Sequence, residues 1–285
     1  MQRLARPVAV CLLTLSAIFA TLPAPAQTTP PPAAPPATAP APAAPVPASA
    51  GQADPALIED LVAAGRILVD QAVLDGFGHV SVRHPKDPTR FLMSRSLAPA
   101  SVTSADIIEH DLDGRGIDAN GRTLFLERFI HAEVYRARPD VMAVVHSHSP
   151  GVVPFTVSKV PMKAMFHNSA FLAGGVPIFE IREAFGMTDM LVSNSAIGKK
   201  LAATLGDKPV VLMRGHGNVV TAPTIQLAVF RAVYTEVNAR LQLQATQLGS
   251  EINFLTPEEG VKADKINEVI SARPWALWKA KAMQK

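Results

Sequence analysis

The chain has 285 residues, of which 48% are hydrophobic, with 27 Lys and Arg against 24 Asp and Glu. A net charge of +3 without any basic stripe excludes an electrostatic case for nucleic acid, and no such partner is expected. The one cysteine, Cys11, lies in the N-terminal apolar run, so disulfides and thiolate ligands are excluded from the rest of the chain.

The first 26 residues have the pattern of a secretory signal peptide. Arg3 and Arg6 precede an apolar run over residues 8–19, and Ala26 ends a small-x-small cleavage pattern. The apolar run is short for a bilayer core of about 30 Å, which disfavours the alternative of an uncleaved anchor. We expect cleavage after Ala26, export to the periplasm and no stable membrane insertion of the mature protein.

Residues 27–54 are rich in Pro, Ala and Thr and nearly uncharged. Such a composition cannot bury a core, so this segment is predicted to be an extended linker. The remainder, residues 55–285, is long enough for one folded domain with a substantial core.

Within residues 55–285, apolar periodicity and turn residues predict alternating helices and strands. Helices are expected over residues 56–74, 127–138, 190–205 and 224–248, with a short helix after Pro150 and an amphipathic piece ending at residues 274–278. Strands are expected over residues 79–83, 90–93, 107–112, 141–145, 176–181 and 209–213. This alternation predicts a layered α/β fold, and the short turn at residues 85–88 favours antiparallel pairing in part of the sheet.

Three histidines stand at the ends of predicted strands. His146 and His148 follow the apolar run 141–145, and a period of two places both side chains on one side of the strand. His216 follows the strand at 209–213, between two glycines that allow a sharp bend and close backbone approach. With a nearby carboxylate, three such imidazoles suit one divalent ion such as zinc, manganese or iron.

Glu127 is the candidate carboxylate. It begins the helix that leads into the His146 strand, so it could ligate the metal or act as a base beside it. The alternative is an acid that merely stabilises the N-terminus of its helix. Of the other histidines, His84 and His110 lie among turn residues and charges and are expected to be structural.

These residues also carry a resemblance to a known family. Residues 55–250 resemble the class II aldolase and adducin family through the following positions: Gly78-His79-Val80-Ser81, Glu127, His131, Tyr135, Arg138-Pro139-Asp140, Val144 to His148, Gly174-Gly175 and His216-Gly217. The resemblance implies a three-layer α/β/α domain with a central, mainly antiparallel sheet, usually assembled as a homotetramer. It also implies a divalent metal on His146, His148 and His216, with Glu127 as a further ligand and then a base.

The departures from the family pattern bear on the substrate. Where phosphosugar aldolases hold phosphate, this chain has Arg95-Ser96 and the apolar pair Phe125-Leu126, and His79 replaces the family's asparagine. An apolar pair cannot donate hydrogen bonds to phosphate, whereas the fork of Arg95 suits a carboxylate. The substrate-binding positions implied are His79, Ser81, Arg95 and Ser96.

With these departures the chain is similar to the family branch that decarboxylates hydroxylated aromatic dicarboxylates. The resemblance implies a carbon-carbon lyase that holds one divalent metal, preferably zinc or manganese and otherwise cobalt or iron, and acts on a small carboxylate. Glu127 or His167 would protonate the product, because His167 aligns near a catalytic tyrosine of the aldolases. The alternatives are an aldolase or epimerase for a substrate without phosphate, a non-catalytic adducin-like binding module, and an exported metal scavenger.

Overall fold

The computed structural model describes residues 47–284. The predicted signal peptide and most of the predicted linker lie outside these residues. No helix within the described range is both long enough and apolar enough to cross a membrane.

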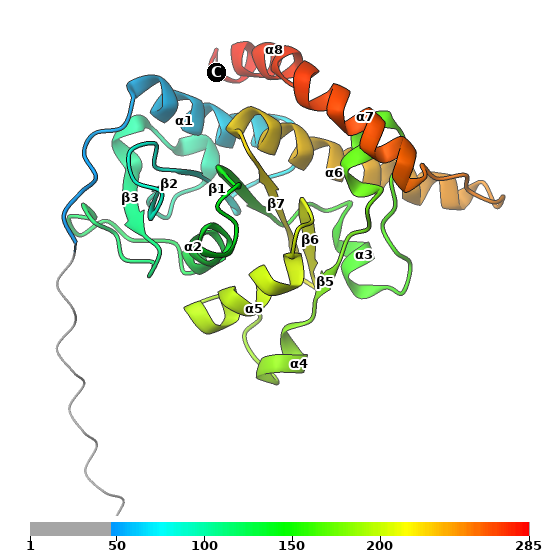
Figure 1. The fold of residues 1–285 in the computed structure, drawn as a ribbon, viewed down its shortest axis with the longest axis horizontal. Helices are drawn as coiled ribbons and strands as arrows, with labels where there is room; N and C mark the ends of the chain where they lie inside the picture. The colour runs from blue at the N-terminus through cyan, green and yellow to red at the C-terminus, as the bar shows by residue number, and fades with distance from the viewer. Residues whose placement is uncertain (1–46, 285) are drawn as a thin grey trace, which may run out of the picture. The chain divides into compact units, whose positions relative to one another are not determined.

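A seven-stranded sheet forms the centre of the described chain (Figure 1). Its strands are β1 His79–Arg83, β2 Arg90–Ser94, β3 Ile107–Asp111, β4 Ala143–Ser147, β5 Ile178–Phe179, β6 Val210–Met213 and β7 Gly217–Ala222. They are ordered β3-β2-β1-β4-β7-β6-β5, and the pairing is antiparallel except between β5 and β6. The predicted mainly antiparallel sheet is confirmed.

Helices cover both faces of this sheet and complete the predicted three layers (Figure 1). One face packs against α1 Pro55–Asp70 and α6 Ile225–Gln247, and the other against α2 Arg128–Ala137 and α5 Ser195–Leu205. Helix α8 Ala272–Ala282 packs on α1 and α6. The remaining helical segments are α3 Val153–Val157, α4 Ile181–Phe185, α7 Pro257–Ile270 and the 3-10 turns Pro99–Ser101, Ser104–Asp106 and His167–Leu172.

Alternation along the strands divides the core in two. Val145 and Val220 pack towards α1 and α6, whereas their neighbours Val144 and Val219 pack towards α2 and α5. A sheet covered on both faces needs apolar side chains on both, which explains why its central strands read as continuous apolar runs.

Two predicted helix boundaries are wrong. The first helix ends at Asp70 and not at residue 74, because Ala72 takes φ +56° and the N–H groups of Val73 and Leu74 both donate to Leu68 O. Helix α5 begins at Ser195 and not at residue 190, because the Asn194 side chain accepts from Ile197 N–H and caps the helix there.

Strand β7 is the largest departure from the predicted elements. Residues 217–222 were expected to be loop, yet they pair with both β4 and β6, so His216 lies in a hairpin turn. A Cβ at Gly217 would collide with the Ser147 carbonyl, so only glycine fits where β7 passes the end of β4. The predicted strand 176–181 is shorter, since Ile181 starts α4, and the amphipathic tail is two helices.

The last residues of the predicted linker pack against the domain. Ser49 Oγ and Ala50 N–H donate to the Glu109 carboxylate, and His84 Nε2 is 3.0 Å from Gly51 O. A Pro- and Ala-rich composition does not reveal such backbone-mediated contacts. The folded part therefore begins before residue 55, and His84 has a structural role within the described chain.

Candidate metal site

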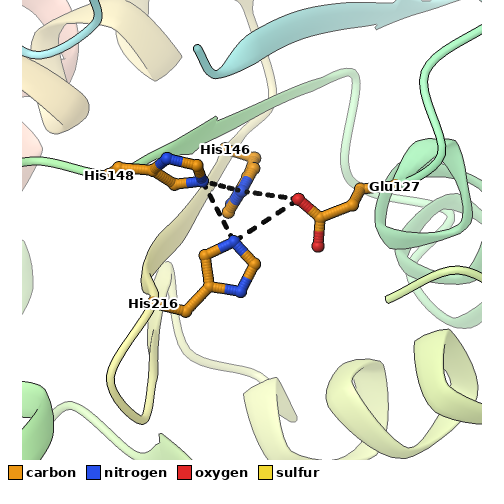
Figure 2. Close-up of side chains that lie close together, drawn as sticks. All are labelled: Glu127, His146, His148 and His216. Carbon is orange, nitrogen blue, oxygen red and sulfur yellow. Dashed lines mark hydrogen bonds and ion pairs between the residues drawn. The ribbon is translucent and has the colours of Figure 1, made fainter. Parts of the chain in front are cut away.

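Four side chains converge at one edge of the central strands (Figure 2). His146 is the penultimate residue of β4, and His148 directly follows that strand. His216 lies in the β6–β7 turn, and Glu127 occupies the N-cap position of α2. One ligand atom from each lies within 4.8 Å of all the others. The structure therefore brings together all four residues that the sequence analysis assigned to a metal.

Backbone carbonyls set the orientation of two of these imidazoles. His146 Nδ1 is 3.1 Å from Asn218 O, and His216 Nδ1 is 3.1 Å from Met190 O. A carbonyl only accepts, so each Nδ1 carries the hydrogen and each Nε2 presents a lone pair. Fixing a ligand tautomer through the other ring nitrogen is the usual device around metal-bound histidine.

The spacing of the inward atoms fits a metal ion. His148 Nε2 is 3.2 Å from His146 Nε2 and 3.0 Å from His216 Nε2, and Glu127 Oε2 is 3.3 and 3.4 Å from the same two atoms. Ligands at ~2.0–2.1 Å from zinc at tetrahedral corners would stand about 3.4 Å apart. Converging lone pairs repel one another unless a cation lies between them, so these donors fit a divalent ion.

The electrostatics of the cluster favour an ionised carboxylate. Burial raises the pKa of Glu127, but His146 and His216 outweigh burial and lower that pKa far below its usual range. Burial lowers the pKa of His216, but the hydrogen bond to Glu127, the charge of Glu127 and the contact with Met190 O together outweigh burial and raise that pKa overall. Burial, His146 and His216 lower the pKa of His148 to about 4, so this imidazole is neutral and ready to ligate near neutral pH.

The other Glu127 oxygen is held by the backbone. Val192 N–H donates to Glu127 Oε1 at 2.9 Å, which leaves Oε2 to face the histidines. Val192 belongs to the irregular segment before α5, so its contact with Glu127 could not be read from sequence spacing.

A cavity of about 410 Å³ opens beside the cluster. Its walls are mainly apolar, and Glu127, His148, His79 and Ser96 supply polar groups among them. The lining residues are Gly76, Phe77, Gly78, His79, Ser96, Leu97, Ala98, Phe125, Leu126, Glu127, His148 and Leu191. Phe125 and Leu126, the apolar pair at the position where phosphosugar aldolases hold phosphate, thus form part of the cavity wall.

Two of the four predicted substrate-binding residues lie elsewhere. Ser81 is fully buried, and its hydroxyl is hydrogen-bonded to His131 and Tyr135. Arg95 donates through Nε to Asp106 Oδ1 at 2.7 Å and does not line the cavity. The structure thus places His79 and Ser96 in the cavity wall and Ser81 and Arg95 outside it, and a substrate role for any of the four stays a prediction.

His167 lies apart from the cluster within one chain. It is exposed in the turn His167–Leu172, which packs against α6 and α7, and its carbonyl accepts from Asn267. The structure therefore does not join His167 to Glu127 within a single chain, and its predicted role stays a prediction.

A second buried polar group escaped the sequence analysis. His79 Nδ1 is 2.7 Å from His131 Nε2, and Ser81 Oγ is 2.6 Å from His131 Nδ1 and 2.7 Å from Tyr135 Oη. A signal was present: His79 and Ser81 are two apart on a strand, and His131 and Tyr135 are four apart on a helix, so each pair shares a face.

Comparisons with known proteins agree with the fold and the site. The model of the class II aldolase and adducin N-terminal domain matches residues 59–243. Decarboxylase tropJ of Talaromyces stipitatus is 34% identical over 78% of this chain and 92% of its own. The 3,4-dihydroxyphthalate decarboxylase of Arthrobacter keyseri is 32% identical over 69% of this chain and 82% of its own.

Solved structures show the same fold. The L-fuculose 1-phosphate aldolase from Glaciozyma antarctica superposes with a TM-score of 0.67 at 23% identity, covering 80% of this chain and 90% of its own. With the family model spanning most of the folded part, the chain belongs to the class II aldolase and adducin family.

Proposed function

We propose that the protein is a divalent-metal-dependent carbon-carbon lyase that decarboxylates a hydroxylated aromatic dicarboxylate. The observation that carries the proposal is the convergence of His146, His148, His216 and Glu127 at the mouth of an apolar cavity. Relatives named as decarboxylases, including the 3,4-dihydroxyphthalate decarboxylase, support the reaction class.

The cavity walls suit an aromatic ring. Phe77 and Leu126 are large apolar side chains that are 67% and 62% exposed at the cavity, and Phe125 and Leu191 extend the apolar wall. Exposed apolar area of this kind gains about 25 cal/mol per Å² when a ligand covers it. The Phe77 ring also stacks 6.1 Å from His148, so a bound ring would lie beside the ligand cluster.

The residues divide the chemistry between them. The three histidines and Glu127 would hold a divalent ion, whose Lewis acidity would stabilise the charge left on the substrate when its carbon-carbon bond breaks. Glu127 Oε2 faces the same space, where the carboxylate could take a proton from water or from the substrate hydroxyl and pass it to that carbon, while Val192 N–H holds the other oxygen in place. His79 and Ser96 stand in the cavity wall where they can orient a second carboxylate.

The experiment is a product analysis with the purified protein. On incubation with 3,4-dihydroxyphthalate and related hydroxylated dicarboxylates, the proposal expects metal-dependent release of CO2 and the matching monocarboxylate. Aldehyde products from hydroxy-carbonyl substrates would instead favour the aldolase alternative. Metal binding without turnover of either substrate class would favour a scavenger, and absence of both would favour a binding module.

Three finer proposals accompany this function. We propose zinc or manganese as the metal, since imidazole and carboxylate ligands suit both, with cobalt and iron as the alternatives. We propose a homotetramer, which exposed apolar residues on α7 and α8 such as Val269 and Leu277 support. We also propose export with cleavage after Ala26, to be tested by N-terminal sequencing of protein recovered from the periplasm.

A further inference from the structure

A chain of buried polar groups leads from the cavity into the interior. It runs from His79 through His131 and Ser81 to Tyr135, with successive polar atoms 2.7, 2.6 and 2.7 Å apart. None of the four residues is more than 5% exposed. The hydrogen bonds in such a series can all donate outward to the cavity or all donate inward. The hydrogen-bonding partners of the innermost residue determine which direction is adopted.

The inner end is the Tyr135 hydroxyl. Burial raises the pKa of Tyr135, so the phenol keeps its hydrogen. Within residues 47–284, Ser81 is the one acceptor hydrogen-bonded to it. The guanidinium of Arg83 lies over the Tyr135 ring, but guanidinium has no acceptor atom. Tyr135 therefore donates to Ser81.

The direction of the remaining hydrogen bonds follows because each hydroxyl has only one hydrogen to donate. Ser81 accepts from Tyr135 and so gives its own hydrogen to His131 Nδ1. His131 then carries its hydrogen on Nε2 and donates to His79 Nδ1. In the opposite direction the Tyr135 hydrogen would be buried without an acceptor, which native structures avoid.

The outer end of the chain is His79 Nε2. With Nδ1 accepting, the hydrogen of the ring lies on Nε2, and no group within the described residues is hydrogen-bonded to that atom. His79 lines the cavity, and its ring lies 5.0 Å from that of His146 and 4.6 Å from that of Phe125. The hydrogen is thus offered where a substrate would lie.

We propose that Tyr135, Ser81 and His131 are positioning residues that fix His79 as a hydrogen-bond donor to an anionic oxygen of the substrate, a carboxylate or phenolate. The substrate half of this inference rests on the proposed function. The other half concerns the protein alone, namely the hydrogen-bond relay from Tyr135 through Ser81 and His131 to His79, so the two halves can fail separately.

The first test reads the tautomer directly. In the full chain with ¹⁵N-labelled histidine, long-range ¹H–¹⁵N spectra should show His79 protonated at Nε2 only, with assignment by His79→Gln. Ser81→Ala should convert this signal into a mixture of tautomers. The control Thr221→Val removes a buried hydroxyl from strand β7 of the same sheet, outside the relay, and should leave the signal unchanged. A hydrogen on His79 Nδ1, or no effect of Ser81→Ala, would overturn the relay.

The second test concerns the substrate. With a turned-over hydroxylated dicarboxylate, Ser81→Ala should lower kcat/KM about tenfold while metal content stays at the wild-type level, because a misplaced donor loses part of an interaction worth up to ~10²–10³-fold. Wild-type kinetics in Ser81→Ala, despite mixed tautomers, would overturn the donor role. A protein that decarboxylates nothing would refute the proposed function and leave the tautomer result standing.

Discussion

Two histidine groups lie side by side in this protein, and they differ in whether their polar atoms have hydrogens to share. Around Glu127, His146 and His216 the polar atoms are lone pairs that point at one spot. In the relay of His79, His131, Ser81 and Tyr135, every hydrogen has an acceptor up to the cavity. The first group offers lone pairs that suit a cation, whereas the second is complete without one. Counting donors thus separates a candidate metal site from a network that positions a side chain.

Removal of two ligands should give the largest effect. His146→Ala/His148→Ala should lose the metal and lower kcat on the order of 10³-fold, because several kcal/mol of charge stabilisation disappear. Activity and metal content are measured on the same preparation. Ser81→Ala, in the neighbouring group, should keep its metal; loss of metal there would erase the distinction between the two groups.

Glu127→Gln should lower kcat by ~10²–10⁴, the usual value of a positioned proton donor or acceptor. Glu133→Gln is the matched control, because Glu133 is a buried carboxylate on the same helix that pairs with Arg136 outside the cluster. Steady-state kinetics decide the question, and full activity in Glu127→Gln would remove its assigned role.

Metal affinity should depend on pH through His216. The raised pKa of His216 means that a metal must displace a proton below that pKa, so affinity should fall about tenfold per pH unit there and level off above it. His148, with its pKa near 4, should add no slope around neutrality. Chelator competition across pH 5.5–8.5, a window of about one unit below and two above the usual histidine pKa, measures this slope.

In the metal-free protein, His216 and Glu127 should change the folding stability in opposite directions as the pH rises. The raised pKa of His216 stabilises the fold below the ordinary histidine pKa of about 6.5, and this stability is lost as pH rises through the raised value. The lowered pKa of Glu127 stabilises the fold at pH values above the ordinary pKa of a glutamate, and this stability is lost as the pH falls.

For metal affinity, a flat pH profile, or metal retained unchanged at about pH 4, would contradict ligation by three histidines.

The smallest effect is expected in the apolar wall. Leu126→Ala should raise KM about fivefold with little change in kcat, because roughly 1 kcal/mol of apolar contact is lost equally from bound substrate and transition state. Met187→Ala removes a side chain that is 89% exposed and absent from the cavity lining, and should change neither constant. A fall in kcat alone would show that Leu126 acts on the reacting geometry.

The sequence predicted that His146, His148, His216 and Glu127 lie together, and local periodicity and spacing carried part of that prediction. Alternation along a strand turns His146 and His148 to one side. Flanking glycines leave room for His216, and Glu127 stands at the start of the helix that leads into the His146 strand. The α/β layers followed from the same periodicities. These features need no knowledge of distant partners.

What could not be predicted depends on partners distant in the sequence. Arg95 Nε donates to Asp106, and the Ser81 hydroxyl is hydrogen-bonded to His131 and Tyr135; neither set of partners follows from the sequence. Strand β7 was missed because Gly217-Asn218 reads as a turn, whereas pairing with β4 and β6 makes it a central strand. Tertiary context decided each of these cases.

The most direct test of the candidate site is metal content per chain, measured by elemental mass spectrometry on protein without residues 1–26. The wild type should hold close to one divalent ion, and His146→Ala/His148→Ala should hold none. A wild type that stays metal-free after supplementation with zinc, manganese, cobalt and iron would contradict the metal site and, with it, the proposed lyase.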